Sequence, residues 1–287
     1  MIDQLLALDP GRRGIERFFV RGGAAAAALA LRRSRRALLT TGFAVGPGLP
    51  ETDGPPGAAV LGRALRRLGA TVTYVTDAVT VPPLQAALTA LGEPVEVVTF
   101  HPMSDAAGAA RRILAEYAPG HLVSVERPGR ASDGDYRSAR GESVKEWNGP
   151  LDELFLQAPK RAVTVGIGDG GNEIGMGNVR PRIARGGSRA RAIASIVRVR
   201  HLVVAGTSNW GAYAVVAELS ALTGRGLLHS AEEERAMVRA CVAAGAVDGI
   251  TRRHEATVDG LPLEAHVGML ELLRLFAQPR KTGGRDR

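Results

Sequence analysis

The sequence has little of the chemistry that cross-links or common catalytic motifs require. Cys241 is the only cysteine among 287 residues, which excludes an intrachain disulfide and a cysteine-based zinc site. The six histidines show no metal-ligand spacing, and neither a G-x-S-x-G nucleophile motif nor a G-K-[S/T] phosphate loop occurs. Disulfide scaffolds, P-loop enzymes and hydrolases with a nucleophile elbow are therefore excluded.

Long hydrophobic runs are also absent. The one signal-like stretch, residues 24–31, is too short to span a bilayer and is followed by arginines instead of a cleavage site. This stretch predicts a helix that leads into the first strand. We expect a cytoplasmic protein that does not associate with membranes.

Aromatic residues make up only 4% of the chain, which argues against a stacking platform for single-stranded nucleic acid. Lysine is scarce as well: only Lys145, Lys160 and Lys281 occur among the 37 Lys and Arg residues, which leaves 34 arginines. This skew, with abundant alanine and glycine, is consistent with genome composition. The net charge of +8 favours anionic ligands. We expect a small anionic molecule as the partner, no nucleic acid, and leave a homo-oligomer open.

Short apolar, β-rich runs alternate with helix-like stretches, which predicts βαβ units and a mostly parallel sheet with helices on both faces. We expect a single α/β domain over residues 1–287, a Rossmann-like three-layer sandwich with a sheet of about six strands. A flexible tail is expected at 279–287. The predicted strands are residues 36–43, 70–75, 94–100, 121–126, 161–167 and 201–206; the predicted helices are 58–68, 83–91, 105–117, 151–156 and one that ends at 222.

Residues 180–200 carry seven arginines and no acidic residue. We interpret them as a basic excursion from the domain. It can be a mobile cover over the site, a subunit contact or simply a solvated surface.

Polar residues gather just past the ends of four predicted strands. In a parallel sheet these ends lie on one edge, where α/β proteins bind their ligands. The four clusters are therefore expected to form one site. They are Glu51-Thr-Asp53-Gly, Glu126-Arg127-Pro-Gly, Gly168-Asp169-Gly-Gly-Asn172-Glu173 and Ser208-Asn209-Trp210.

The loop "GIGDGGNEIGMGN" at 166–178 contains a G-x-G-x-x-G match but is a poor dinucleotide fingerprint. Asp169 would repel the phosphates that a helix N-terminus attracts, and the next acidic residue after Glu173 is Glu218. We therefore expect no dinucleotide cofactor. Glycine permits close approach of a small ligand, and Asp169 and Glu173 can transfer protons or hold Mg²⁺ or Mn²⁺. The structural alternative is a tight turn in which Asp169 or Asn172 caps a helix.

The other loops supply further candidates. Glu51 and Asp53 precede a helix that Pro55 and Pro56 help to start, so Asp53 is also a candidate cap, whereas Glu51 has no such structural role.

Residues 126–141 mix both signs of charge and form either a solvated lid or a closing loop. In the second case Arg127 and Arg137 grip a substrate carboxylate. Ser208 and Asn209 lie at the mouth of a helix, where Ser208 can bind a ligand or act as the N-cap.

Four of these stretches, "ETDGPPGA", "ERPGR…DG.Y", "GIGDGGNEIGMGNV" and "SNWG.YA", occur in an order that resembles the D-glutamate cyclase family, specifically its C-terminal domain. The likeness spans about residue 8 to beyond residue 248. It implies a hydro-lyase that cyclises D-glutamate to 5-oxo-D-proline with loss of water.

Two departures from the family pattern stand out. Eukaryotic members resemble fusions with an N-terminal hydro-lyase-like domain that is not found here, which leaves another substrate open. The family also carries an acidic residue just before its last strand, where this chain reads Val199-Arg200-His201.

The resemblance and the loop chemistry together imply a set of roles. Asp169, Glu173 and Glu126 are the expected catalytic groups, with Asp169 and Glu173 as ligands if a divalent cation (Mn²⁺ or Mg²⁺) takes part. No other cofactor is expected. Two alternatives stay open: an enzyme acting on a nucleotide or phosphorylated ligand, and a non-catalytic ligand-binding domain. The expected substrate-binding residues are Glu51, Asp53, Arg127, Arg137, Asn172, Ser208 and Asn209.

Overall fold

A computed structural model describes residues 1–101 and 105–277. The flexible tail predicted at 279–287 lies outside these residues. Within them, no helix is both long enough and apolar enough to cross a membrane.

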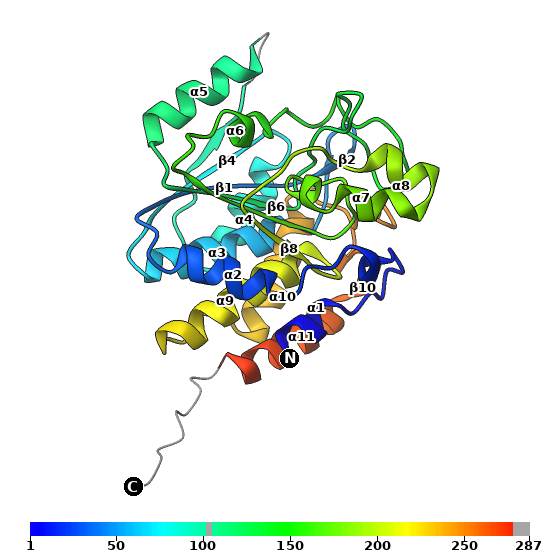
Figure 1. The fold of residues 1–287 in the computed structure, drawn as a ribbon. Helices are drawn as coiled ribbons and strands as arrows, with labels where there is room; N and C mark the ends of the chain where they lie inside the picture. The colour runs from blue at the N-terminus through cyan, green and yellow to red at the C-terminus, as the bar shows by residue number, and fades with distance from the viewer. Residues whose placement is uncertain (102–104, 278–287) are drawn as a thin grey trace, which may run out of the picture.

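A six-stranded sheet with every neighbouring pair parallel forms the centre of the fold (Figure 1). Its order is β5-β4-β1-β6-β7-β8. From β1 the chain adds β4 and β5 on one side of the sheet, and it then crosses back to add β6, β7 and β8 on the other side. The strands are β1 (Arg36–Thr41), β4 (Thr71–Thr76), β5 (Val97–Thr99), β6 (His121–Val125), β7 (Val163–Gly168) and β8 (His201–Val204).

The two faces of the sheet are covered by separate apolar cores, because successive side chains of a strand point to opposite sides. Leu38 of β1 packs in one core and Leu39 in the other, and Leu122 and Val123 of β6 divide in the same way. The strands are consequently apolar throughout, and a Rossmann-like three-layer sandwich is confirmed.

The helices of the larger core lie below the sheet in Figure 1, and α10 and α11 close its outer side. The N-terminal α1 packs against α9 and α11. The helices on this side are α1 (Ile2–Leu6), α2 (Gly23–Leu31), α3 (Pro55–Arg67), α4 (Val81–Ala90), α9 (Ser208–Thr223), α10 (Ala231–Ala243) and α11 (Leu263–Phe276).

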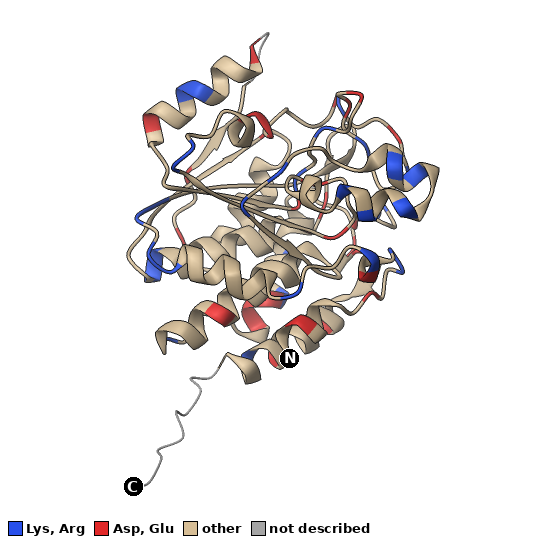
Figure 2. Ribbon diagram, in the orientation of Figure 1, with Lys and Arg blue, Asp and Glu red and all other residues tan. Residues whose placement is uncertain are grey.

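Above the sheet lie α5 (Ala106–Tyr117) and α6 (Glu153–Leu156), and two short helices lie at the right of Figure 1, beside the end of the sheet. These are α7 (Arg180–Ile183) and α8 (Ser188–Ile193), which make up the arginine-rich excursion. Figure 2 shows their basic residues gathered at one side of the molecule. Two strand pairs, β2 (Ala44–Gly46) with β3 (Leu49–Pro50) and β9 (Thr257–Val258) with β10 (Leu261–Pro262), lie outside the main sheet.

The predicted strands and helices between residues 36 and 223 are all present, with ends shifted by a few residues. The helix predicted at 58–68 begins at Pro55 because proline is favoured in the first turn, where a helix leaves its N–H groups unbonded. Gly57 in that turn allows α3 to approach α9 closely, since a Cβ there would lie 2.8 Å from Asn209 Oδ1. This contact brings the loop after β1 beside the start of α9.

Candidate active site

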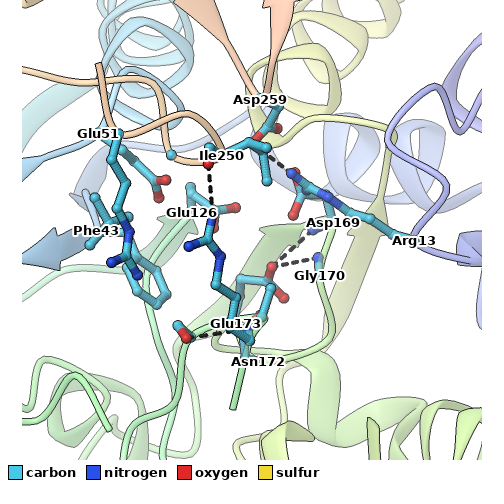
Figure 3. Close-up of a pocket in the computed structure, with 16 residues that line it drawn as sticks. Arg13, Phe43, Glu51, Glu126, Asp169, Gly170, Asn172, Glu173, Ile250 and Asp259 are labelled. Carbon is cyan, nitrogen blue, oxygen red and sulfur yellow. Dashed lines mark hydrogen bonds and ion pairs between the residues drawn. The ribbon is translucent and has the colours of Figure 1, made fainter. Parts of the chain in front are cut away.

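A narrow cavity of about 70 Å³ lies beyond the carboxyl ends of the strands (Figure 3). The loops after β1, β6 and β7 converge there. The chain after β1 runs to β4 on one side of the sheet, and the chain after the neighbouring β6 runs to β7 on the other side. The cavity therefore lies at the topological switch point between β1 and β6. Its lining is Arg13, Phe43, Val45, Glu51, Glu126, Ser138, Ala139, Arg140, Asp169, Gly170, Asn172, Glu173, Gly249, Ile250, Arg252 and Asp259.

The glycine loop after β7 is held by its own glutamate. The Glu173 carboxylate accepts hydrogen bonds from the backbone N–H groups of Asp169 (3.3 Å), Gly170 (2.6 Å) and Gly171 (2.8 Å). Gly171 has a φ of +98°, which strongly favours glycine. The turn therefore directs the Asp169 side chain into the cavity, as Figure 3 shows.

The loop after β6 is tied to the glycine loop by backbone bonds. Gly129 N donates to Asn172 O at 2.9 Å, and Ile174 N donates to Arg127 O at the same distance. The Asn172 side chain donates to the carbonyl of Arg137 at 2.8 Å. The two loops thus form one rigid wall.

Glu126 lies at the base of this wall in an unusual conformation. Its φ of +45° is rare for a non-glycine residue, and the side chain is buried. Ser208 Oγ donates a hydrogen bond to Glu126 Oε2. Burial, together with the negative charges of Glu173 and Glu51, raises the pKa of Glu126 well above its ordinary value.

Asp53 is buried behind Glu126 at the N-terminus of α9. Its two oxygens accept from Ser208 N and Asn209 N, each at 2.8 Å. Burial and the Asp259 charge raise the pKa of Asp53 to about 8, although both amide bonds favour the carboxylate. Burial also raises the pKa of Glu51, and the carboxylates of Asp259 and Asp53 raise it further.

A cation from the N-terminal segment enters this group of acids. Arg13 forms ion pairs with Asp169 and, at 2.6 Å, with Asp259. Burial opposes its charge, but Asp169 and Asp259 outweigh that effect and raise the pKa of Arg13. Asp9 anchors the loop by accepting from Arg13 N at 2.8 Å and Gly14 N at 2.6 Å. Asp169 remains a carboxyl with a raised pKa, because burial outweighs the nearby guanidinium.

The predicted site residues fall into three groups. Five line the cavity, and three others lie just behind it, where they form hydrogen bonds with neighbouring loops and helix ends. Asn209 Oδ1, for example, accepts from the backbone of Gly54 (3.0 Å) and Gly57 (2.8 Å). The five lining residues are Glu51, Glu126, Asp169, Asn172 and Glu173; the three behind are Asp53, Ser208 and Asn209.

The two arginines expected to hold a carboxylate form the third group, because neither lines the cavity. Arg127 is fully buried and pairs with Asp77 at 2.6 Å, while donating to the carbonyls of Gly42 and Gly149. Arg137 pairs with Asp133 at 2.6 Å on the outside of the loop. The guanidinium groups that do line the cavity belong to Arg13, Arg140 and Arg252.

The capping alternatives for the predicted residues are wrong. Gly54, not Asp53, is the N-cap of α3, and Asp53 binds the amides of α9 instead. The N-cap of α9 is Thr207 rather than Ser208. Asp169 and Asn172 cap no helix, because the short helix after the glycine loop starts from Gly175 without a side-chain cap.

Sequence reasoning missed Arg13 and Asp259, which come from opposite ends of the chain. Neither follows a strand of the main sheet, so the strand-end rule does not select them. The weak signal at Asp259 is the Asp-Gly pair of the β9–β10 turn, where Asp259 has a φ of +55°. Ser138, Arg140 and Arg252 were also missed, since they lie in the middle of long loops.

Comparison with known proteins decides the family. The sequence profile described as D-glutamate cyclase-like, C-terminal, matches residues 2–274. The chain belongs to this family. It is also 35% identical over 233 residues to the human protein "D-glutamate cyclase, mitochondrial", an alignment that covers 76% of this chain. The chain spans only 38% of the length of that relative.

Solved structures with distant likeness include "exonuclease RecJ bound to manganese", with 14% identity and a TM-score of 0.41 over 88% of this chain and 50% of that one. An exopolyphosphatase-related protein from Bacteroides fragilis has 8% identity and a TM-score of 0.43 over 88% and 56%. Similarity this low carries no information about function.

The departure at Val199-Arg200-His201 lies away from the family's candidate site. These residues lead into β8, and Arg200 N donates to Thr164 O at 3.1 Å. The cavity lies beyond the opposite, carboxyl end of the strands. The change therefore does not alter the lining of the cavity.

Proposed function

We propose that the protein is a D-glutamate cyclase-like enzyme that converts D-glutamate, or a related small amino acid, into a cyclic amide with loss of water. The observation that carries this proposal is the cluster of buried carboxyls around Arg13. Family membership and the name of the human relative support the same reaction class. Because the chain spans 38% of that relative, the exact substrate is part of the proposal.

The reaction needs both a base and an acid. The substrate ammonium must lose a proton before its nitrogen attacks the side-chain carboxyl carbon. A C–N bond then forms, the nitrogen loses a second proton, one C–O bond breaks, and the departing oxygen takes up two protons to leave as water. A buried carboxyl with a raised pKa can hold a proton at neutral pH and donate it, and the ionised form of such a group accepts a proton more readily than an ordinary carboxylate.

We assign the base to Asp169, which points into the cavity, and the acid to Glu126, whose proton can reach the departing oxygen. Since the buried acids interact, their protons are shared within the cluster. Glu173 holds the turn through three amide bonds, so its part is to position Asp169.

Substrate carboxylates require cationic partners, and the cavity supplies them from other residues than expected. Arg140 donates to Ile250 O at 2.7 Å and Arg252 pairs with Glu142 at 2.7 Å, so both are held at the rim. Binding the substrate in a folded conformation also removes part of the entropic barrier to ring closure.

The acids in and behind the cavity also fit a divalent cation. Carboxylate oxygens of Glu126, Asp169 and Glu173 lie within 4.8 Å of one another, as do those of Asp53, Asp169 and Asp259. Hard oxygen ligands suit Mg²⁺ or Mn²⁺, and Asp169 belongs to both sets. A cation bound there would polarise the substrate carboxyl. Arg13 pairs with Asp169 and Asp259, so it would have to give up at least one of these contacts.

The direct test incubates the purified protein with D- and L-glutamate, with and without Mn²⁺ or Mg²⁺, and follows 5-oxoproline by chiral chromatography. We expect product from the D isomer. Failure to form product from D-glutamate under every condition would exclude it as the substrate. Comparison of the metal-free and metal-containing reactions tests the cation.

A further inference from the structure

A second cavity of about 380 Å³ lies beside the candidate active site. One wall is the N-terminal loop that carries Arg13, and the other is the α7–α8 excursion. Its size falls within the range of small-molecule sites, which are about 300–1,000 Å³. Its lining is Gly11, Arg12, Arg13, Gly14, Arg17, Phe18, Ala139, Gly170, Ile183, Gly186, Arg189, Ala190, Ile193 and Ile250.

The lining of this cavity is basic, with no acidic residue in it. Arg13 is paired with the acids of the first cavity, but Arg12, Arg17 and Arg189 are not. Over residues 1–101 and 105–277, these three side chains form no ion pair with a carboxylate. Three unpaired guanidinium groups around one hollow repel one another, and an oxyanion would offset that cost.

The two cavities adjoin, because Arg13, Ala139, Gly170 and Ile250 line both. Arg13 stands at their junction, with its guanidinium directed at Asp169 and Asp259 (Figure 3). One ligand can therefore place a cationic group among the acids and an anionic group among the arginines.

The α7–α8 excursion is held against the N-terminal segment by a hydrogen bond and by apolar packing. Arg182 Nη1 donates to Phe19 O at 3.1 Å, which links α7 to the N-terminal segment. Ile183 and Ile193 pack their apolar side chains in the core beneath, so the excursion is anchored. Arg17 also lines a neighbouring outer hollow together with Arg182 and Arg185, so the basic surface extends beyond the second cavity. The arginine-rich stretch therefore forms one wall of a second site.

We propose that this arginine cavity binds an oxyanion that the substrate carries in addition to the carboxyl that reacts, a carboxylate or phosphoryl group, while the amine and the reacting carboxyl lie among the acids. Resting on the proposed function, this assigns the substrate class: a glutamate-like amino acid extended by a group that ends in a second oxyanion. The larger volume lies on the basic side, beyond Arg13, and glutamate alone leaves most of it unfilled. Guanidinium forks bind both kinds of oxyanion in bidentate fashion.

The first experiment measures binding without turnover, so it stands even if the proposed reaction fails. Inorganic phosphate and pyrophosphate are titrated by calorimetry at constant ionic strength into the full-length protein. The double variant Arg17→Ala/Arg189→Ala should bind pyrophosphate at least about tenfold more weakly. The matched control is Arg33→Ala/Arg67→Ala, which removes the same charge from two positions that are exposed like Arg17 and Arg189 but do not line the cavity.

Equal affinity of the wild type and the Arg17/Arg189 variant would overturn the proposal. Equal weakening in both double variants would also overturn it, since binding would then reflect net charge alone. Arg17→Lys/Arg189→Lys keeps the charge but not the planar fork, and it should bind with an intermediate affinity.

The second experiment distinguishes the two oxyanion sources. D-Glutamyl-glycine and D-glutamyl-aminomethylphosphonate, both linked through the α-carboxyl so that the amine and the reacting carboxyl stay free, are compared with D-glutamate as ligands and as substrates. The better of the longer ligands identifies the anion, and its advantage over D-glutamate should disappear in the Arg17→Ala/Arg189→Ala variant. If D-glutamate binds most tightly and the variant leaves its KM unchanged, the assignment of the substrate class is wrong.

Discussion

Two groups of buried carboxyls in this protein lie close together and differ in their electrostatics. In the candidate active site, Asp53, Glu126 and Asp169 are buried with one another, and their pKa values are raised. Between α9 and α10, Glu234 is just as buried, yet its pKa is lowered. Burial alone therefore does not determine which form a buried acid takes.

The difference arises from partners. Burial favours the neutral form of Glu234, but His229 Nε2 lies 2.7 Å from its Oε2 and Tyr213 donates to the same oxygen at 2.8 Å. These two contacts stabilise the buried carboxylate of Glu234 in its charged form. In the candidate active site, Arg13 is the one cation of the described residues that pairs with these acids, at Asp169 and Asp259. Asp53 and Glu126 accept hydrogen bonds but form no ion pair within the same residues. The charge of Glu234 is therefore compensated by its partners, whereas the protonated forms of Asp53, Glu126 and Asp169 are favoured.

The largest effect is expected from Asp169→Asn. The substitution keeps the shape of the side chain but removes the proposed base, so turnover should fall by about 10²–10⁴-fold. The free energy of unfolding should fall only moderately, because Arg13 loses its ion pair with Asp169 but keeps the one with Asp259. Rates of product formation and urea unfolding check both. The exposed change Asp133→Asn is the control, and a large loss of stability in Asp169→Asn would instead assign this residue a structural role.

Glu234→Ala should show the opposite pattern. It leaves the Tyr213 hydroxyl and the His229 ring buried without their shared acceptor, so the protein should lose about 3–5 kcal/mol of stability. The folded Glu234→Ala protein, assayed well below the temperature at which it unfolds, should retain most of its activity. Urea unfolding measures the loss of stability. Equal losses of activity and stability at both sites would remove the distinction between the two groups.

Stability should also depend on pH with opposite sign at the two groups. Because the folded pKa of Asp53 is about 8 and its ordinary value is 3.8, the folded state binds the extra proton between these values. Stability from this group therefore falls as pH rises through that window, by up to about 1.4 kcal/mol per pH unit. Thermal or urea unfolding from pH 5 to 8 measures the slope, and Asp53→Asn should flatten it.

Glu234 contributes in the other direction. Its folded pKa lies below the ordinary value, so its stabilisation is present above the unfolded pKa and is lost as pH falls through the folded one. The acid side of the stability profile should therefore be shallower in Glu234→Gln. An unchanged acid limb in this variant would contradict the lowered pKa.

The smallest effect is expected from Glu173→Gln. The amide retains one oxygen, so only part of the set of three backbone bonds is lost, at a cost of about 1–3 kcal/mol. Turnover should fall less than in Asp169→Asn, since Glu173 positions the loop. If Glu173→Gln instead abolished activity without loss of stability, Glu173 would be a catalytic residue rather than one that fixes the conformation of the glycine loop.

Much of the candidate site could be predicted because strand-end loops of a parallel sheet must share an edge. That rule selected Glu51, Glu126 and Asp169, which the structure brings to one cavity. It could not select Arg13 or Asp259, since both lie outside the βαβ units. Arg127 and Arg137 were predicted to bind a carboxylate but do not line the cavity, because their side chains turn to Asp77 and Asp133, and a sequence does not show which charges meet.

The sequence by itself determined the alternating α/β pattern, the parallel sheet and the family. These depend on local propensity and on apolar runs that only a sheet covered on both faces can bury. Only the tertiary structure decided which charges meet. It brought Arg13 from the N-terminal loop and Asp259 from a C-terminal turn to Asp169, and left Arg12, Arg17 and Arg189 around a second cavity. Electrostatic energy depends on distance and burial in space, which sequence separation does not specify.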